Sequence, residues 1–317
     1  MPNFQPLSPA QAAQLLAQGE IVAFPTETVY GLGADAANPQ AIAKVYALKG
    51  RPLDHPSIVH LSAPEEMEEW ARAIPEAAWR LARHFWPGPM TLILPKRPQV
   101  LPQVTGGQDS VGLRLPAHPL TRQLIAALGR GIIGPSANRF GHISPTSALH
   151  VAQEFGESLP FILDGGPCQV GVESTIIDFS GERPLIVRPG MLNAHILSDF
   201  LGFPIEYGQG VRAPGTLKKH YAPDSPTSIW TLEELQELLP QVEEPLALLA
   251  IHPQALPLSN RVRTWTMPSD PQTYARDLYA ALRWADSLHC PKIWIEAVPS
   301  GEEWQAVGDR LRRAAAR

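Results

Sequence analysis

The sequence predicts a mixed α/β protein with two globular parts joined by a linker. Three observations support this fold class: strand and helix patterns interleave along residues 1–205, a stretch without sustained periodicity follows at 206–226, and strands and helices alternate again over 227–317. A chain of 317 residues with 44% hydrophobic content has enough apolar side chains for a core in each part.

The first part opens with a helix, because Ser8, Pro9 and Gln11 form a capping box with proline at the first helical position and Gly19 ends the segment. Strands are then expected at 21–24, 57–61, 91–94, 111–115 and 131–133, and helices at 39–48, 65–72, 75–85, 119–128 and after Ser144–Pro145. Short apolar runs at 161–163, 174–179 and 185–188 alternate with turn residues. Their spacing favours antiparallel pairing beside a partly parallel sheet.

Residues 206–226 are rich in glycine, proline and basic residues, which is typical of a linker. Its centre is unusual, since Lys218, Lys219, His220 and Tyr221 follow one another and could reach back to a ligand. Beyond it, Thr231 and Glu234 form another capping box. Strands at 246–251, 262–266 and 293–298 then alternate with helices at 271–288 and 302–315, which predicts a small Rossmann-like α/β domain with a parallel sheet. No G-x-G-x-x-G fingerprint marks a dinucleotide site.

Composition and charge argue against several classes of protein. No apolar run approaches the roughly 18 residues of a membrane span and Met1 begins no signal peptide, so we expect a soluble cytoplasmic protein. Cys168 and Cys290 are isolated from each other, which gives no support to a disulfide framework or a cysteine zinc site. The net charge is −5, and residues 1–205 hold 14 basic against 17 acidic residues, so the first part is not a basic nucleic-acid platform.

The stretch GEIVAFPTETVYGLG, residues 19–33, interrupts an expected strand with polar side chains and then glycines. Polar residues at the carboxyl end of a strand often line a ligand site in α/β sheets, which makes this stretch a candidate pocket wall. The alternative is purely local: Thr26 and Thr28 satisfy turn backbone groups, and Gly31 and Gly33 make the turn.

Other segments add polar groups of the same kind. Lys49 and Arg51 follow an expected helix and suit phosphate, although such a pair can also be a solvated helix end. His60 ends a strand, and GPSANRFGHISPT, residues 134–146, adds hydroxyls and an amide among glycines that permit close backbone approach.

In this order the segments resemble one family, the threonylcarbamoyl-adenylate synthases with a YrdC-type catalytic domain, in their longer two-domain form. The resemblance runs from about residue 8 to 205 through PTETVYGLG, KGRP, SIVH, PGPMTLIL, VGLRLPAH, PSAN, SPT, EST and RPG, and HYAP in the linker belongs to the long form. It implies a twisted mixed sheet around a large cavity in residues 1–205. It also implies a nucleotidyltransferase for tRNA modification that joins L-threonine, bicarbonate and ATP into threonylcarbamoyl-AMP and releases pyrophosphate.

The resemblance also assigns site residues. Threonine binding falls on Thr28, His60, Arg114, Gly134 and Ser174. ATP binding falls on Lys49, Arg51, His55, Ser110, Ser136, Asn138, Ser144, Arg188, His220 and Tyr221. Lys49, Arg51 and Arg188 would offset phosphate charge together with Mg²⁺ brought by ATP, and no metal site on the protein itself is expected. A guanidinium such as Arg114 can hold a carboxylate with two hydrogen bonds.

One position departs from the family pattern, because His55 stands where asparagine is usual. The expected partners are the three substrates and a downstream tRNA threonylcarbamoyl transferase, with at most weak RNA binding. Two alternatives are weighed: a non-catalytic RNA-binding module, which the acidic first part disfavours, and a carbamoyl-transfer hydrogenase-maturation protein, which would carry zinc-finger cysteine pairs. The sequence leaves open the oligomeric state, the general base, direct tRNA contact and the role of the C-terminal domain.

Overall fold

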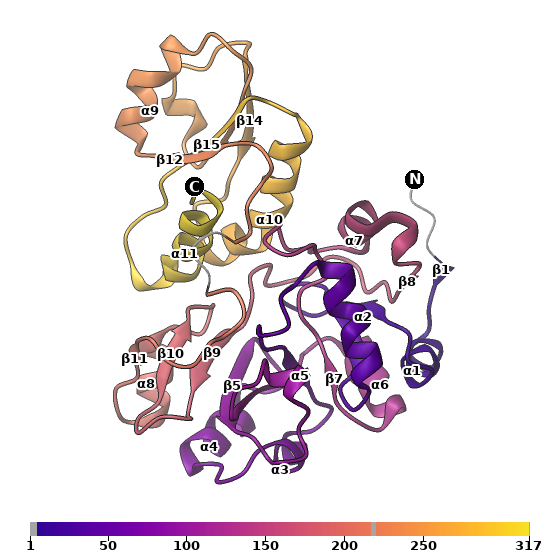
Figure 1. The fold of residues 1–317 in the computed structure, drawn as a ribbon. Coiled ribbons are helices and arrows are strands. Elements are labelled where there is room, and N and C mark those ends of the chain that lie inside the picture. Colours follow the sequence, from indigo (N-terminus) through magenta and orange to yellow (C-terminus); the bar gives the residue numbers. More distant parts are fainter. Residues whose placement is uncertain (1–4, 217–219, 317) are drawn as a thin grey trace. The chain divides into compact units, whose positions relative to one another are not determined.

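The computed structural model describes residues 5–216 and 220–316 (Figure 1). The chain divides into two compact units, the first formed by residues 1–140 and 144–216 and the second by residues 141–143 and 217–317. Lys218 and Lys219, predicted as part of a lid, lie outside the described residues.

The first unit is built on a mixed sheet whose strands follow the order β1-β8-β2-β3-β7-β4-β6-β5-β9-β10-β11. The strands are β1 (Gln5–Pro6), β2 (Val22–Phe24), β3 (Gly31–Asp35), β4 (Ile58–His60), β5 (Met90–Pro95), β6 (Ser110–Arg114), β7 (Ile132–Ile133), β8 (Phe161–Ile162), β9 (Thr175–Asp178), β10 (Leu185–Arg188) and β11 (Glu206–Tyr207). Parallel pairs such as β4–β6 and β5–β9 occur together with antiparallel pairs such as β2–β3 and β5–β6. The predicted mixed sheet is therefore confirmed.

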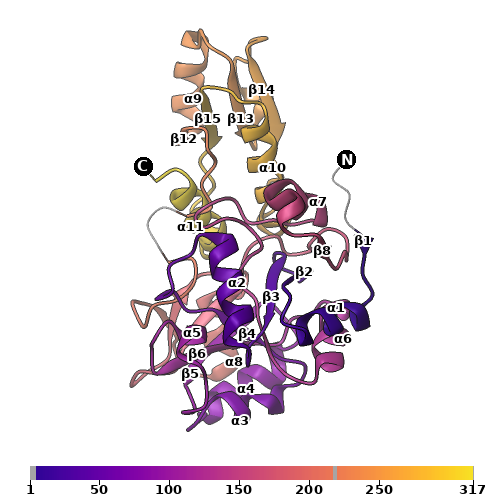
Figure 2. The same cartoon turned by 45° about the vertical axis from the view of Figure 1, so that its right-hand side comes forward.

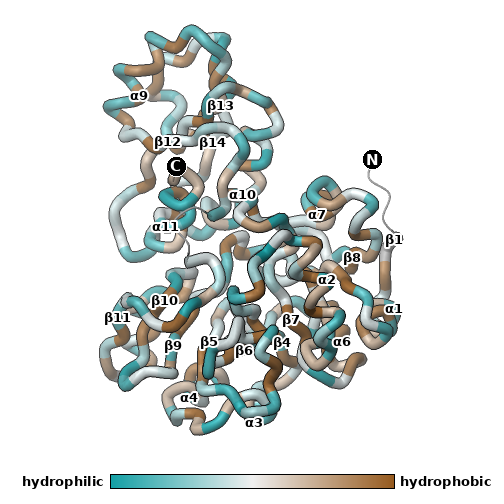
Figure 3. The backbone as a smooth tube through the Cα atoms, viewed as in Figure 1, coloured by the Kyte–Doolittle hydropathy of each residue, from teal (hydrophilic) through white to brown (hydrophobic). Residues whose placement is uncertain are grey.

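Helices flank this sheet (Figures 1 and 2). They are α1 (Pro9–Ala17), α2 (Pro39–Lys49), η1 (Pro64–Glu66), α3 (Met67–Trp70), α4 (Glu76–Phe85), α5 (Pro102–Thr105), α6 (Pro119–Leu128), α7 (Ala148–Phe155), η2 (Gly156–Ser158) and α8 (Ala194–Leu201). The capping box on α1 forms as predicted, with Ser8 Oγ accepting from the backbone N–H of Gln11. Hydrophobic segments follow the central strands (Figure 3), where Val59, Leu113 and Ile133 are fully buried.

Three local expectations for the first unit were wrong. Gly31 and Gly33 do not make a turn but belong to β3, which pairs with β2. Position 31 needs glycine because a Cβ there would come within 2.4 Å of the Phe24 ring across the strand pair. The run at 161–163 pairs parallel with β1 and β2 instead of antiparallel with its neighbours in sequence. Residues 206 and 207, taken as linker, extend the sheet as β11 beside β10.

The second unit has the predicted parallel sheet, in the order β12-β15-β13-β14. Its elements are β12 (Thr227–Trp230), α9 (Leu232–Leu238), η3 (Leu239–Gln241), β13 (Leu246–Ala250), η4 (Pro253–Ala255), β14 (Val262–Thr266), α10 (Pro271–Ser287), β15 (Lys292–Glu296), η5 (Glu302–Trp304) and α11 (Gln305–Ala314). Strand β12 was not predicted. Among the described residues, no helix is both long and apolar enough to cross a membrane.

Candidate active site

The polar stretch after β2 forms the loop between β2 and β3. Thr26 organises this loop, since its Oγ1 accepts from the backbone N–H groups of Thr28 and Val29, both at 3.1 Å. Thr28 is fully buried, and its Oγ1 lies 2.9 Å from Thr26 Oγ1. The local-turn reading is thus correct for Thr26, while Thr28 and Glu27 are side chains that the loop holds inside the unit.

Arg114, at the end of β6, is paired with a carboxylate that the sequence analysis did not assign. Its Nη2 lies 2.5 Å from Oε1 of Glu27, and the backbone N–H of Ala117 donates to Oε2 at 2.9 Å. The Nε atom of Arg114 is buried and has no hydrogen-bond partner among the described residues. The signal that could have found Glu27 was its place between Thr26 and Thr28 in a buried loop.

His60 lies beside Arg114 because β4 and β6 pair parallel with these two residues in register. Burial, followed by the nearby Arg114 charge, lowers the pKa of His60 from 6.5 to about 3, so the imidazole is neutral at physiological pH. Its Nδ1 is buried without a partner in the described part of the chain. A Cβ at Gly134 would lie 2.6 Å from His60 Cε1, which explains the glycine.

Ser174 links the residues predicted to bind threonine with those predicted to bind ATP. Arg188, predicted for ATP, donates from Nε and Nη2 to the Ser174 carbonyl at 3.1 and 2.9 Å and from Nη2 to Ser174 Oγ at 3.0 Å. Thr91 Oγ1 lies 2.7 Å from Ser174 Oγ. A residue predicted for threonine and one predicted for the nucleotide therefore touch inside the first unit.

Lys49 is buried at the end of α2, with 3% of its surface exposed, so the alternative of a solvated helix end is wrong for this residue. Its Nζ donates to the backbone carbonyls of Ser136 and Asn138, both at 2.5 Å. Burial, followed by the nearby Arg51, holds the pKa of Lys49 well below its usual value. Three of the predicted nucleotide residues are thus brought together.

Arg51 and His55 lie on the loop that follows α2. Arg51 is buried, donates from Nη2 to the Pro56 carbonyl at 2.5 Å, and stacks over the Tyr46 ring with its Cζ 5.7 Å from the centroid. His55 meets the Phe140 ring edge-on, with centroids 5.2 Å apart. Partial burial and Arg51 lower the pKa of His55 below 6.5. The residue that departs from the family pattern is thus an aromatic neighbour of Phe140.

Ser110 and Ser144 occupy two different places. Ser110 lines a small cavity, together with Thr91 and with Arg212 and Pro214 of the predicted linker. Ser144 donates to Oε1 of the buried Glu173 at 2.7 Å. Glu173 is a second acidic residue that the sequence analysis did not assign.

The first half of the predicted linker is bound to the first unit. The backbone N–H of Val211 donates to Asp178 Oδ2 at 3.1 Å, and that of Arg212 donates to Gln108 Oε1 at 2.9 Å. The Arg212 side chain pairs with Asp54 at 3.1 Å. Residues 206–216 are therefore not a free tether.

His220 and Tyr221 belong to the second unit. The Tyr221 ring centroid lies 5.6 Å from that of Tyr279, and the Arg310 guanidinium lies 5.4 Å from the Tyr221 ring. The backbone N–H of Ala222 donates to the Gly141 carbonyl at 3.0 Å. Their contact with ATP stays a prediction.

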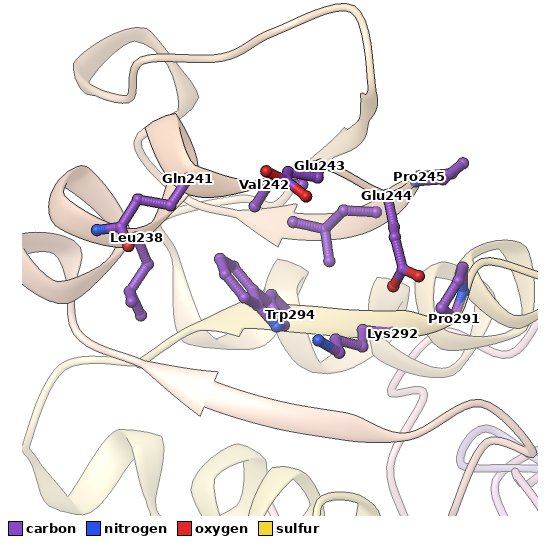
Figure 4. Close-up of a pocket in the computed structure, with 10 residues that line it drawn as sticks. Leu238, Gln241, Val242, Glu243, Glu244, Pro245, Pro291, Lys292 and Trp294 are labelled. Carbon is purple, nitrogen blue, oxygen red and sulfur yellow. The ribbon is translucent and has the colours of Figure 1, made fainter.

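Two further observations concern the described chain outside these contacts. The described residues include no cluster of three or more His, Cys, Asp or Glu side chains that could hold a metal ion. A pocket in the second unit lies between Leu238, Glu244, Lys292 and Trp294 (Figure 4), and none of the predicted site residues lines it.

The first unit has a large mixed sheet with buried arginine, lysine, histidine and hydroxyl side chains, and a separate parallel-sheet unit follows it. These features define a two-unit protein of the YrdC-type fold. Two family profiles match the chain: one described as "Telomere recombination" over residues 14–190, and one described as "Threonylcarbamoyl-AMP synthase, C-terminal domain" over residues 183–316. The chain belongs to the threonylcarbamoyl-AMP synthase family.

Individual relatives agree with this family over nearly the whole chain. The threonylcarbamoyl-AMP synthases of Pyrococcus abyssi and Bacillus subtilis are 38% and 39% identical to it, each alignment covering 96% of this chain and 92% of the relative. A solved structure of P. abyssi Sua5 complexed with L-threonine matches with a TM-score of 0.89 and 36% identity, covering 97% of this chain and 94% of that one. Escherichia coli YciO, 21% identical with a TM-score of 0.52, shares the fold.

Proposed function

We propose that this chain is a threonylcarbamoyl-AMP synthase, which joins L-threonine, bicarbonate and ATP and releases pyrophosphate as the first step of N6-threonylcarbamoyladenosine formation in tRNA. The observation that carries the proposal is the contact of Arg188 with Ser174, which joins a cation suited to phosphate to a hydroxyl suited to the amino acid in one buried site. The full-length similarity to synthases of the same name supports it.

In this proposal threonine binds at Arg114 and His60, which lie in register, and at Gly134 beside His60, with Thr28 and Ser174 as further ligands. The open Nε edge of Arg114 suits the substrate carboxylate. Thr28 and Ser174 supply short hydroxyls for the substrate hydroxyl, and neutral His60 offers an unpartnered ring nitrogen. Gly134 contributes only backbone and leaves room for the imidazole.

In the same proposal ATP binds at the residues that include Arg188, which contacts Ser174. Lys49, Arg51 and Arg188 offset the phosphate charge, while Ser110, Ser136, Asn138 and Ser144 supply polar contacts and His55 supplies an aromatic edge beside Phe140. The residues proposed for ATP are cations, hydroxyls and an amide, whereas Mg²⁺ prefers carboxylates. The buried carboxylate beside them, that of Glu173, accepts a hydrogen bond from Ser144. Mg²⁺ is therefore proposed to arrive with ATP, where it neutralises charge on the triphosphate.

The reaction needs no nucleophile from the protein. The deprotonated amino group of threonine takes up carbon dioxide or bicarbonate to give a carbamate. A carbamate oxygen then attacks the α-phosphate in line, and pyrophosphate leaves. The side chains hold the two reacting groups in place and balance their charge.

Water has to be kept from the carbamate and from the adenylate. Residues 206–216, held by Asp178, Gln108 and Asp54, border the small cavity through Arg212 and Pro214. We propose that this segment closes the site during the reaction. Delivery of the product to a downstream tRNA threonylcarbamoyl transferase belongs to the same proposal.

The decisive experiment measures pyrophosphate release from ATP by the full chain. Release is expected only when L-threonine and bicarbonate are both present, with serine in place of threonine as the control. Salt-dependent RNA binding without any ATP turnover would instead favour the non-catalytic RNA-binding module, which the acidic balance of residues 1–205 disfavours.

A further inference from the structure

The ion pair of Glu27 with Arg114 is buried on both sides, with 10% of the glutamate side chain and 5% of the arginine side chain exposed. Glu27 is held at both carboxylate oxygens, one 2.5 Å from Arg114 Nη2 and the other 2.9 Å from the backbone nitrogen of Ala117. The carboxylate therefore has a fixed position beside the guanidinium.

The guanidinium of Arg114 has further hydrogen-bond donors that a second carboxylate can use. Each terminal nitrogen of arginine has two hydrogens, so Nη2 can serve Glu27 and still donate once more. Nε is buried without a partner in the described chain. Nε and the second Nη2 hydrogen together form the two-pronged edge that a ligand carboxylate prefers. Glu27 thus leaves the edge of Arg114 open for a ligand.

The charges at this end of the site offset one another. His60, in register with Arg114 on the neighbouring strand, is neutral because of its burial. Thr28, Thr91 and Ser174 carry no charge. Arg188 contacts Ser174 from the nucleotide end and already donates to the carbonyls of Ser174 and Pro214. The pair of Glu27 with Arg114 accordingly has no net charge to offer to an anion.

We infer that Glu27 makes this pocket selective for a zwitterionic α-amino acid: Arg114 binds the carboxylate, and the fixed carboxylate of Glu27 favours the positively charged amino group on the same carbon. The inference rests on the proposed function, since it concerns the same threonine site. It adds a residue that sets specificity, because a carboxylate ligand without an amino group meets the charge of Glu27 with nothing to compensate it.

The test compares two ligands of nearly equal shape by isothermal titration calorimetry at pH 7. L-Threonine carries both charges, whereas 2,3-dihydroxybutyrate of matching stereochemistry has a hydroxyl in place of the amino group and is a plain anion. The unmodified full chain is expected to bind threonine at least about tenfold more tightly. Equal affinity for the two ligands overturns the inference without any variant.

The variant Glu27→Gln keeps the size of the side chain and removes its charge. It is expected to weaken threonine binding by about tenfold and to strengthen binding of the anion, so that the preference narrows or reverses. Asp35→Asn is the matched control, because Asp35 is also a buried carboxylate, paired with Arg130 at 2.7 Å and holding the backbone nitrogen of Ala37 at 2.9 Å. Asp35→Asn should therefore keep the preference for threonine over the anion.

A merely structural Glu27 would give a different result. Equal weakening of both ligands by Glu27→Gln overturns the inference, whereas Glu27→Asp, which keeps the charge, should keep the preference for the zwitterion even if both affinities fall. Failure of the unmodified chain to bind threonine at all would instead contradict the proposed function, so the two failures can be told apart.

Discussion

The two halves of the candidate site differ in how their polar groups are satisfied. At the threonine end, Arg114 Nε and His60 Nδ1 are buried without partners in the described chain. At the nucleotide end, Lys49 and Arg188 already donate to backbone carbonyls of Ser136, Asn138, Ser174 and Pro214. The first half is thus preformed for a small ligand, while the cations of the second half also support the loops that hold them. Substitutions at either end can therefore lower stability, but each end should weaken the binding of a different substrate.

The largest effect is expected for Arg114→Ala. The substitution removes the donor for the substrate carboxylate, and it leaves Glu27 as a buried charge without its partner, at a cost of about 3–5 kcal/mol in stability. At a temperature where the variant is folded, the KM for threonine should rise by about 100-fold while the KM for ATP changes little. Equal losses for the two substrates would show that Arg114 does not belong to the threonine half.

Lys49→Ala sharpens the comparison at the other end. The carbonyls of Ser136 and Asn138 lose a charged donor, so the free energy of unfolding should fall by about 1–3 kcal/mol, and ATP affinity should fall as well. Thermal melting and nucleotide binding measure the two effects. Lys44→Ala is the matched control, because Lys44 lies on the same helix with 46% of its side chain exposed. A variant with normal ATP binding and an early melting transition would make Lys49 purely structural.

His60 provides a pH test of the buried threonine end. Its pKa is about 3 in the folded protein and near 6.5 when unfolded, so the unfolded chain binds the extra proton between these values. Stability should therefore be complete above about pH 6.5 and fall as the pH drops, by about 2 kcal/mol at pH 5. Chemical denaturation of the unmodified chain and of His60→Gln at pH 7 and pH 5 measures this. If the free energy of unfolding falls by the same amount between pH 7 and pH 5 in the variant, other groups cause the loss of stability in acid.

The smallest effect on stability is expected for Asp54→Asn, at the exposed ion pair with Arg212. Such pairs contribute about 0–1 kcal/mol, so the melting temperature should hardly change. If residues 206–216 close the site, the variant should nonetheless convert a larger share of ATP to AMP and pyrophosphate without yielding threonylcarbamoyl-AMP. Product yield per pyrophosphate, measured with the exposed pair of Arg83 and Glu76 as a control position outside this segment, tests this. An unchanged yield argues against a closing role for this contact.

Strong local patterns identified most of the elements. Helix α6 was predicted with its observed bounds, since proline begins it and Gly129 ends it in the left-handed conformation at φ 73°. Strand β3 was missed because glycine is unfavourable in strands, and its glycines are explained only by the Phe24 ring on the neighbouring strand. Gly134 is likewise explained only by a residue on another strand, because a side chain there would meet the imidazole of His60.

The sequence by itself determined the chemistry available to this protein, because the motifs and their order name the family and the side chains that suit a carboxylate and a triphosphate. Only the tertiary structure decided which groups are already occupied. The pairing of Glu27 with Arg114, and the burial of Lys49 on the carbonyls of Ser136 and Asn138, depend on contacts between residues 87 to 89 positions apart. Sheet register and loop packing create these contacts, and neither follows from the periodicity of a single segment.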